Sequence, residues 1–259
     1  MVDISVVLPA YNEAAIVGGS LRRLAEFLAA PGSGPWTRWE ILLVDDGSAD
    51  GTPEVARRAL PDAQRLGIHA HGANRGKGAA VRTGLMAAAG EIVIVTDVDL
   101  SYGLPDIERM ARALGAEGGL HDMVTGDRRH PEARLDLALS ALGHVMWRQT
   151  LSAAFNVAVR LAYGLPWRDT QCGLKGFRRE AAQRIARRLL TEGFLADIEM
   201  FLIAGELGLK VTGIPVHLTY LSADSTVNVV RSLPRVARDA WEIKRHQVRG
   251  GYAREPGVT

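Results

Sequence analysis

The sequence has little cysteine, almost no net charge and no long apolar run. Its 259 residues include a single cysteine, Cys172, which excludes an intramolecular disulfide and is typical of a reducing compartment. The formal net charge of +2 is too small to indicate nucleic-acid binding. No stretch of about 18 uncharged apolar residues occurs, so we expect no membrane-spanning helix. Asp3 and the apolar run at residues 4–8 predict a strand at the start rather than a secretion signal.

Two common nucleotide-binding motifs are also missing. No Gly-x-Gly-x-x-Gly follows the first expected strand, which argues against a dinucleotide oxidoreductase. Gly76 and Lys77 are followed by glycine rather than serine or threonine, and His71 takes the place of the first P-loop glycine. Cys172 has no histidine in a recognisable arrangement with it, so we do not expect a thiol nucleophile.

The sequence instead shows strand patterns alternating with helix patterns. Strands are expected at residues 4–8, 40–44, 68–71, 92–96 and 121–125. The first helix should bury Val17, Leu21, Leu24 and Leu28, and Thr52-Pro53 should cap and begin the second. Further helices are expected at residues 79–89 and 105–114. This alternation predicts an α/β fold with a doubly wound, mostly parallel sheet.

A polar cluster follows each of four expected strands. These clusters are Pro9–Glu13, Asp45–Ser48, Asn74–Gly78 and Asp97–Asp99. Because ligands bind beyond the carboxyl ends of the strands in such sheets, the four clusters should share one edge and form one site.

Asp97 and Asp99 give this site its chemistry. Side chains two residues apart on extended backbone point the same way, so both carboxylates should converge on one point. Converging carboxylates favour a hard divalent cation, Mg²⁺ or Mn²⁺. The alternative is a polar turn in which an aspartate caps the next helix.

Together these motifs resemble glycosyltransferase family 2, whose Rossmann-like nucleotide-sugar-binding fold is called GT-A. The resemblance lies in the order and spacing of the four clusters and covers roughly residues 4–230, which implies one catalytic domain at 1–230. Two later motifs, Asp169-Thr-Gln-Cys-Gly-Leu-Lys-Gly-Phe177 and Asp197-Ile-Glu199, are similar to the branch that transfers hexose to polyprenyl or dolichyl phosphate. Their Thr-Gln-Cys-Gly version most resembles the dolichyl-phosphate glucosyltransferases.

The resemblance assigns roles to residues of the four clusters. It implies that Asp97 and Asp99 are catalytic and hold the metal against the donor's diphosphate. Some mannosyl relatives have glutamine where this chain has Ser101, and we do not expect Ser101 to be a ligand. The donor-binding residues implied are Pro9, Tyr11, Glu13, Asp45, Asp46 and Lys77.

The acceptor decides which further residues are catalytic. A phosphate monoester has a second pKa of about 6, so as nucleophile it needs cations rather than a base. Arg128 is the first candidate, with Asp127 beside it as a neutralising charge. A hydroxyl acceptor would need a general base, and Asp197 is the candidate; otherwise Asp197 orients the arginine or caps a helix. Gln171, Lys175 and Arg178 are the remaining acceptor-binding candidates.

The second half of the chain predicts a membrane-facing surface. Residues 136–164 are apolar with a polar residue at every fourth position, which predicts an inserted amphipathic helix pair broken near residues 149–152. Residues 231–249 predict a basic helix that anionic lipid would attract, and residues 250–259 a disordered tail. Packing against the sheet and a solvated basic face are the alternatives.

We therefore expect an inverting, metal-dependent enzyme that transfers glucose from UDP-glucose to polyprenyl phosphate. It should act peripherally at the cytoplasmic face of a membrane. The alternatives are mannose transfer from GDP-mannose, transfer to a soluble hydroxyl acceptor, and a non-catalytic nucleotide-sugar-binding scaffold. The sequence leaves the base, the hexose, the lipid length and the oligomeric state open.

Overall fold

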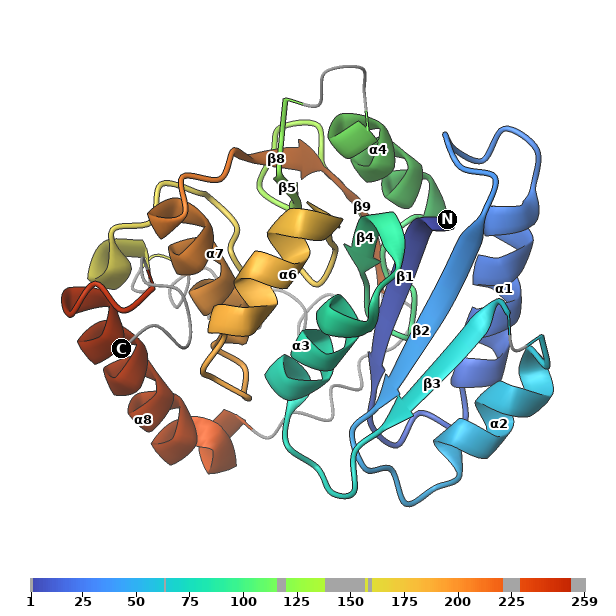
Figure 1. Cartoon of the computed structure of the whole chain (residues 1–259), viewed down its shortest axis with the longest axis horizontal. Helices are drawn as coiled ribbons and strands as arrows, with labels where there is room; N and C mark the ends of the chain where they lie inside the picture. Colours follow the sequence, from blue (N-terminus) through green and yellow to red (C-terminus); the bar gives the residue numbers. More distant parts are fainter. Residues whose placement is uncertain are drawn as a thin grey trace.

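A seven-stranded, mostly parallel sheet forms the centre of the molecule, as expected (Figure 1). The computed structural model describes residues 2–62, 64–115, 120–137, 157, 160–220 and 229–252. Only β7 runs antiparallel to its neighbours. In sheet order the strands are β3 (Leu66–Ala70), β2 (Trp39–Asp45), β1 (Val2–Ala10), β4 (Gly90–Val95), β7 (Lys175–Arg178), β5 (Met123–Asp127) and β8 (Val211–Pro215).

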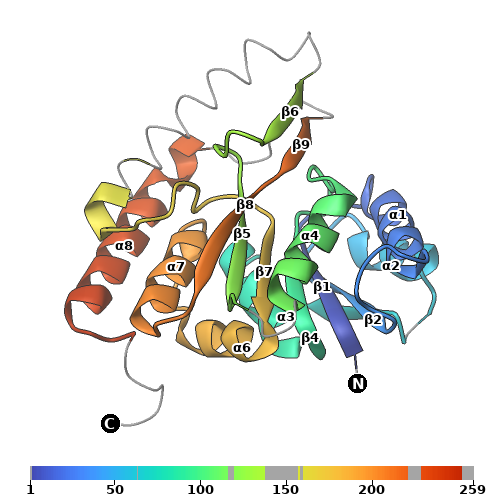
Figure 2. The same cartoon turned by 90° about the horizontal axis from the view of Figure 1, so that it is seen from above.

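Helices cover both faces of this sheet (Figure 2). One face packs against α1 (Val17–Ala29), α2 (Thr52–Ala59) and α4 (Leu104–Gly115). The other packs against α3 (Lys77–Ala87), α6 (Arg179–Arg188), α7 (Ala196–Glu206) and α8 (Val229–Val248). The doubly wound arrangement is therefore confirmed, and it explains why the strands are apolar on both faces.

The first two helices show how the local pattern becomes structure. In α1 the four leucine and valine side chains expected inside are all buried. In α2 the expectation was wrong by one position, because Gly51 is the N-cap and Thr52 is the first helical residue. The Thr52 hydroxyl instead donates to Asp50 and accepts the backbone N–H of Glu13 at 2.8 Å. It thereby fixes the start of a cluster that follows β1.

A small second sheet corrects the start of the expected helix pair. Residues 136 and 137 belong to β6 (Arg134–Leu137), which pairs in parallel with β9 (His217–Tyr220). This happens because β6 follows β5 and β9 follows the neighbouring β8, so both leave the main sheet together. Residues 157 and 160–163 are helical, and the rest of 136–164 lies outside the described residues.

The C-terminal helix is confirmed and packs into the core. Ile243 of α8 is fully buried beside α6 and α7. The expected disorder of 250–259 is wrong at its beginning, because Tyr252 is also fully buried. Its hydroxyl donates to Glu199 at 2.8 Å, and its carbonyl accepts from Arg188 at 3.1 Å. Among the described residues, no helix is long and apolar enough to cross a bilayer.

Candidate functional site

The direction of each strand decides which residues meet at the site. The polar clusters after β1, β2, β3 and β4, and the segment after β5 that holds Arg128, leave the same edge of the sheet because these strands are parallel. Strand β7 is antiparallel, so the segment that precedes it, residues 169–174, reaches that edge as well. Lys175 accordingly pairs with Val95 at the end of β4, whereas Arg178 pairs with Ile92 near its beginning.

Arg178 is therefore wrong as an acceptor-binding residue. It lies at the opposite edge of the sheet, about three residues of extended chain or roughly 10 Å from Lys175. Its guanidinium donates to the carbonyls of Leu114 at 2.8 Å and His121 at 3.1 Å. Arg178 joins α4 to the start of β5 and has a structural role.

Asp97 is the centre of the site. The ammonium group of Lys77, the first residue of α3, donates to Asp97 Oδ1 at 2.5 Å. Burial alone would raise the pKa of the Asp97 carboxyl, but the positive charges of Lys77, Lys175 and Arg128 hold it below its ordinary value. Asp97 is consequently an anion over the whole physiological pH range.

Gly173 allows the Thr-Gln-Cys-Gly segment to pack against Asp97. A Cβ atom at position 173 would collide with Asp97 Oδ2 and lie 3.3 Å from the Tyr102 ring. The Gly173 N–H donates to the Tyr102 hydroxyl at 3.0 Å, which fixes the segment. Two motifs more than 70 residues apart thus meet at one carboxylate. Burial raises the pKa of the neighbouring Cys172 thiol to about 11, in keeping with a structural cysteine.

Asp99 and Glu13 supply further negative charge. Asp99 is exposed and accepts hydrogen bonds from the backbone N–H of Ser101 at 3.0 Å and from the Ser101 hydroxyl. The pKa of Glu13 is raised by burial and by the charges of Asp99, Asp50 and Asp97. Glu13 therefore lies within electrostatic reach of both aspartates of the expected metal pair.

The expected metal pair has a suitable donor set. Asp97 and Asp99 offer carboxylate oxygens, which Mg²⁺ and Mn²⁺ prefer, and Lys77 already places a positive charge on Asp97. Within the described ranges, no group of three or more His, Cys, Asp or Glu side chains could hold a metal ion. A divalent ion would thus depend on the two aspartates together with donor oxygens and water.

Arg128 is bound by a different acid from the one expected. Its Nε and Nη2 atoms donate to the buried carboxylate of Asp169 at 2.7 and 2.9 Å. Burial would lower the pKa of Arg128, but the bond to Asp169 raises it above its ordinary value. Asp127, the expected neutralising residue, instead accepts the backbone N–H of Arg129 at 2.9 Å. The Nη1 nitrogen of Arg128 makes no hydrogen bond within the described part of the chain and is left for a ligand.

Lys175 and Asp197 form a second internal pair. The Lys175 side chain is 1% exposed and its ammonium group donates to Asp197 at 2.6 Å. It also donates to the carbonyl of Cys172 at 2.5 Å. The expected contact between Lys175 and an acceptor is therefore wrong, because the ammonium group is buried and bound to Asp197 and to the Cys172 carbonyl. Asp197, at the start of α7, is the counterion of this buried lysine.

Asp45 and Asp46 lie at the end of β2 with different surroundings. Asp46 accepts from His71 Nδ1 at 2.7 Å and from the N–H groups of Arg75 and Gly76, so it shapes the loop that leads to Lys77. Gly76 has a φ of 119°, a value that favours glycine. Asp45 differs, because its Oδ1 atom is buried without a hydrogen-bond partner among the described residues. A buried acceptor of this kind suits a donor group on a ligand.

The remaining candidate residues lie around the rim. Tyr11 is 47% exposed and follows Pro9 on the loop after β1. The backbone N–H of Gln171 donates to Asp169 at 3.2 Å, which places Gln171 beside Arg128. Apart from Arg178, the expected site residues lie on segments at this edge of the sheet, and Asp45, Asp46 and Lys175 among them are buried.

Three residues of the site were not expected from the sequence. They are Asp169, Tyr102 and Gly173, which hold Arg128 and the segment beside Asp97 in place. Two of them belong to the quoted motif 169–177, and a motif glycine is a signal for close approach of backbone to a functional group. The pairing of Arg128 with Asp169, which is 41 residues away, has no local signal.

The chain is similar to a known protein family and to several known proteins. The family model for glycosyl transferase family 2 matches residues 5–186. The chain is 31% identical to Glycosyltransferase AglD of Haloferax volcanii over 93% of its own length, but spans only 38% of that protein. It is 31% identical to the dolichyl-phosphate beta-glucosyltransferase of Drosophila melanogaster and 30% identical to that of Homo sapiens. These two alignments cover 93% and 87% of this chain, and 74% and 70% of the relatives.

Solved structures share the fold at lower identity. One is glucosyl-3-phosphoglycerate synthase from Mycobacterium tuberculosis with Mn²⁺, UDP-glucose and phosphoglyceric acid, with a TM-score of 0.61 and 20% identity. It is matched over 99% of this chain and 82% of that one. Another is mannosyl-3-phosphoglycerate synthase from Rubrobacter xylanophilus, with a TM-score of 0.62, 20% identity, and coverage of 98% and 77%. The expected GT-A fold is thereby confirmed.

Proposed function

Because the chain belongs to glycosyl transferase family 2 and is a glycosyltransferase, we propose that it transfers glucose from UDP-glucose to polyprenyl phosphate with inversion and a divalent cation. The observation that carries the proposal is the packing of the 169–175 segment against Asp97. In this arrangement Arg128 lies within electrostatic reach of Asp97, which supports a donor diphosphate and an acceptor phosphate bound next to each other. The relatives named as dolichyl-phosphate beta-glucosyltransferases support the choice of glucose, of a lipid phosphate and of a β-linked product.

The residues on the donor side would bind and neutralise the leaving group. A divalent ion held by Asp97 and Asp99 would stabilise the charge that develops on the diphosphate. Lys77 lies at the same point and adds a second positive charge. The unpartnered oxygen of Asp45 would accept a hydrogen bond from the nucleotide, and the exposed ring of Tyr11 would cover the base.

Arg128 would hold the acceptor phosphate. Its bidentate bond to Asp169 fixes the guanidinium plane, and Nη1 remains to donate a charge-assisted hydrogen bond. A phosphate nucleophile is already deprotonated near neutral pH, so no side chain needs to remove a proton. Asp197 fits this mechanism as a positioning residue, because its carboxylate is bound to the buried ammonium group of Lys175.

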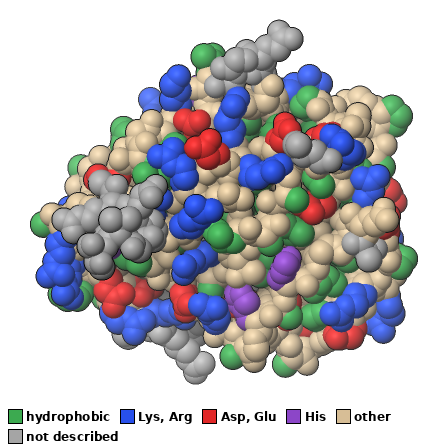
Figure 3. Space-filling view, viewed as in Figure 1, with side chains coloured by type: hydrophobic (Ala, Val, Ile, Leu, Met, Phe, Trp, Pro, Cys, Tyr) green, Lys and Arg blue, Asp and Glu red, His purple; other side chains and the backbone are tan. Residues whose placement is uncertain are grey.

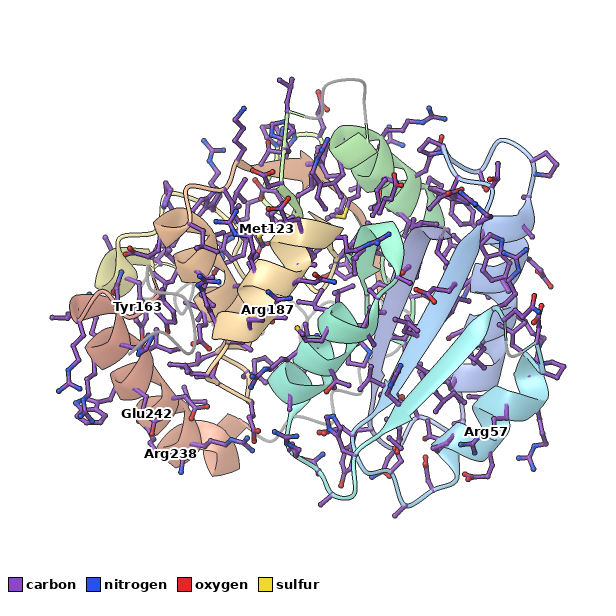
Figure 4. The ribbon with its side chains drawn as sticks, in the orientation of Figure 1. Arg57, Met123, Tyr163, Arg187, Arg238 and Glu242 are labelled. Carbon is purple, nitrogen blue, oxygen red and sulfur yellow. The ribbon has the colours of Figure 1, made fainter. Side chains whose placement is uncertain are left out.

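The outer surface of α8 supports a peripheral position at the cytoplasmic face of a membrane. Trp241 and Val248 of α8 are 61% and 76% exposed, and Leu161 is 80% exposed. Leu161 is followed by two residues that bind α8. The Ala162 carbonyl accepts from the Lys244 ammonium group, and the Tyr163 hydroxyl donates to the Ala240 carbonyl. Arg238 lies on the outer side of the same helix (Figure 4), and Lys and Arg side chains gather along this edge of the molecule (Figure 3). Exposed apolar and basic side chains together suit an anionic lipid surface.

The direct test follows labelled sugar into lipid. Purified protein would be incubated with polyprenyl phosphate and either UDP-glucose or GDP-mannose, with Mg²⁺, with Mn²⁺ or with excess chelator. We expect lipid-linked β-glucose from UDP-glucose alone, none with chelator, and a rate lower by about a hundredfold or more in Asp99→Asn. Full activity in chelator would disprove the metal requirement, and mannose transfer would disprove the assignment of the donor.

A further inference from the structure

Three ion pairs lie at the site, and Asp97 is the acidic member of one of them. They are Lys77 with Asp97, Lys175 with Asp197, and Arg128 with Asp169. In the described part of the chain, Asp99 and Glu13 have no ion-pair partner. In the site without ligands, Asp97 is therefore paired with Lys77, and the carboxylates of Asp99 and Glu13 lie nearby.

Lys77 differs from the other two cations in how it is held. The ammonium group of Lys175 has two protein acceptors and is enclosed, and Arg128 has a bidentate acid. The Lys77 side chain is 31% exposed and its ammonium group bonds to Asp97 alone among the described residues. A single, partly exposed ion pair is weak and can be exchanged.

The position of Lys77 overlaps that of a metal ion. Its nitrogen lies 2.5 Å from Asp97 Oδ1, whereas Mg²⁺ binds carboxylate oxygens at about 2.1 Å. The other oxygen, Oδ2, packs against Gly173, where even a Cβ atom would collide with it. Oδ1 is thus the oxygen of Asp97 at which a cation is seated.

We infer that Lys77 is a built-in competitor of the divalent ion for Asp97. It neutralises Asp97 in the protein without ligands and gives up Oδ1 when the ion binds. Its released ammonium group then pairs with the donor's diphosphate. This inference rests on the proposed metal-dependent function and adds a coupling to it. The ion frees Lys77 for the diphosphate, so each ligand strengthens the binding of the other.

The competition predicts that removing a contact improves metal binding. Mn²⁺ affinity would be measured on the whole chain without nucleotide, by electron paramagnetic resonance of the free ion. We expect Lys77→Met and Lys77→Gln to bind Mn²⁺ roughly fivefold more tightly than wild type, the scale of one partly exposed ion pair. Lys77→Arg keeps the charge and should bind as wild type does. Lys210→Met removes an exposed lysine just before β8, at the far edge of the sheet, and serves as the charge-matched control.

A second readout separates competition from a general loss of charge. UDP affinity would be measured by calorimetry with and without saturating Mn²⁺. Lys77→Met should bind UDP more weakly than wild type when Mn²⁺ is present, and the gain in UDP affinity caused by Mn²⁺ should shrink. Tighter Mn²⁺ binding together with weaker UDP binding in one variant supports the inference.

The outcomes that overturn the inference differ from those that overturn the function. Suppose Asp99→Asn abolishes Mn²⁺ binding but both neutral Lys77 variants bind Mn²⁺ no more tightly than wild type. Lys77 is then no competitor, although the metal site stands. If wild type binds no Mn²⁺ in an Asp99-dependent manner, the inference and the metal requirement fall together.

Discussion

At the scale of single residues, the position of Asp97 depends on the absence of a side chain at Gly173. Gly173→Ala should lower the transfer rate by about a hundredfold, the effect of moving a catalytic group by about 1 Å. The Cβ must displace either Asp97 or the 169–175 segment. The measurement is kcat with the melting temperature recorded alongside.

The matched control for this substitution is Gly19→Ala. A Cβ at Gly19 of α1 meets no atom within 4 Å, and alanine favours a helix. We expect unchanged kcat and equal or higher stability. If Gly173→Ala is as active as this control, Asp97 does not depend on Gly173.

Glu13 gives a prediction of pH dependence at the same scale. Its pKa is raised in the folded protein by burial and by the charges of Asp99, Asp50 and Asp97, so folding favours its protonated form. That stabilisation is complete below the unfolded pKa and is lost as the pH rises through the folded pKa. Glu13→Gln should therefore raise the melting temperature at about pH 7 and leave it unchanged at about pH 4. A lower melting temperature at neutral pH would contradict this account of Glu13.

At the scale of secondary structure, periodicity predicted β1 to β5 and α1, but neither the later strands nor the direction of β7. The buried face of α1 could be predicted because its spacing is local. The antiparallel direction of β7 could not, because four residues with partners on β4 and β5 carry no local sign of direction. Because β7 runs antiparallel, Lys175 is buried at the carboxyl edge of the parallel strands and Arg178 lies at the opposite edge of the sheet. Residues 136–137 were misassigned similarly, since their partner β9 lies about 80 residues later in the chain.

The ordered position of Tyr252 near the end of the chain also depends on residues distant in the sequence. A polar, glycine-containing tail predicts disorder, yet Tyr252 is buried and its hydroxyl donates a hydrogen bond to the buried carboxylate of Glu199. Tyr252→Phe should cost about 1–3 kcal/mol of unfolding free energy, because a buried charged acceptor loses a donor. Tyr163→Phe, which removes a bond to the neutral carbonyl of Ala240, should cost less, about 1 kcal/mol. Equal costs in urea unfolding would contradict the special role of Glu199.

At the scale of the whole molecule, the site is assembled from segments between residue 9 and residue 197. The four N-terminal clusters could be predicted to meet because parallel strands share an edge. The ion pairs of Arg128 and Lys175 could not, because they depend on side-chain packing between distant segments. The motifs therefore predicted which segments share this edge of the sheet, while the structure was needed to identify which of their charged side chains are already paired.

The outer side of α8, with Trp241 and Val248 exposed, is the proposed membrane-facing surface. The protein should co-sediment with vesicles of anionic lipid, and Trp241→Ala and Arg245→Ala should each weaken binding by several-fold. The Arg245 guanidinium lies 5.1 Å from the Trp241 ring centre, so both act at one place. Arg57→Ala on α2, at the other end of the molecule (Figure 4), is the charge-matched control. Equal loss with the control variant would contradict a specific surface on α8.

In the proposed reaction, a lipid phosphate held by Arg128 attacks the sugar without a general base. The most direct measurement compares glucose transfer to polyprenyl phosphate with transfer to the free polyprenol, in wild type and in Asp197→Asn. We predict transfer to the phosphate alone, and a loss in Asp197→Asn that stays the same as the pH falls, because Asp197 positions Lys175 rather than accepting a proton. Transfer to the free alcohol but not to the phosphate would contradict the account. A loss of about a thousandfold or more in Asp197→Asn, the scale of a missing general base, with the matching pH dependence of the wild-type rate, would contradict it equally.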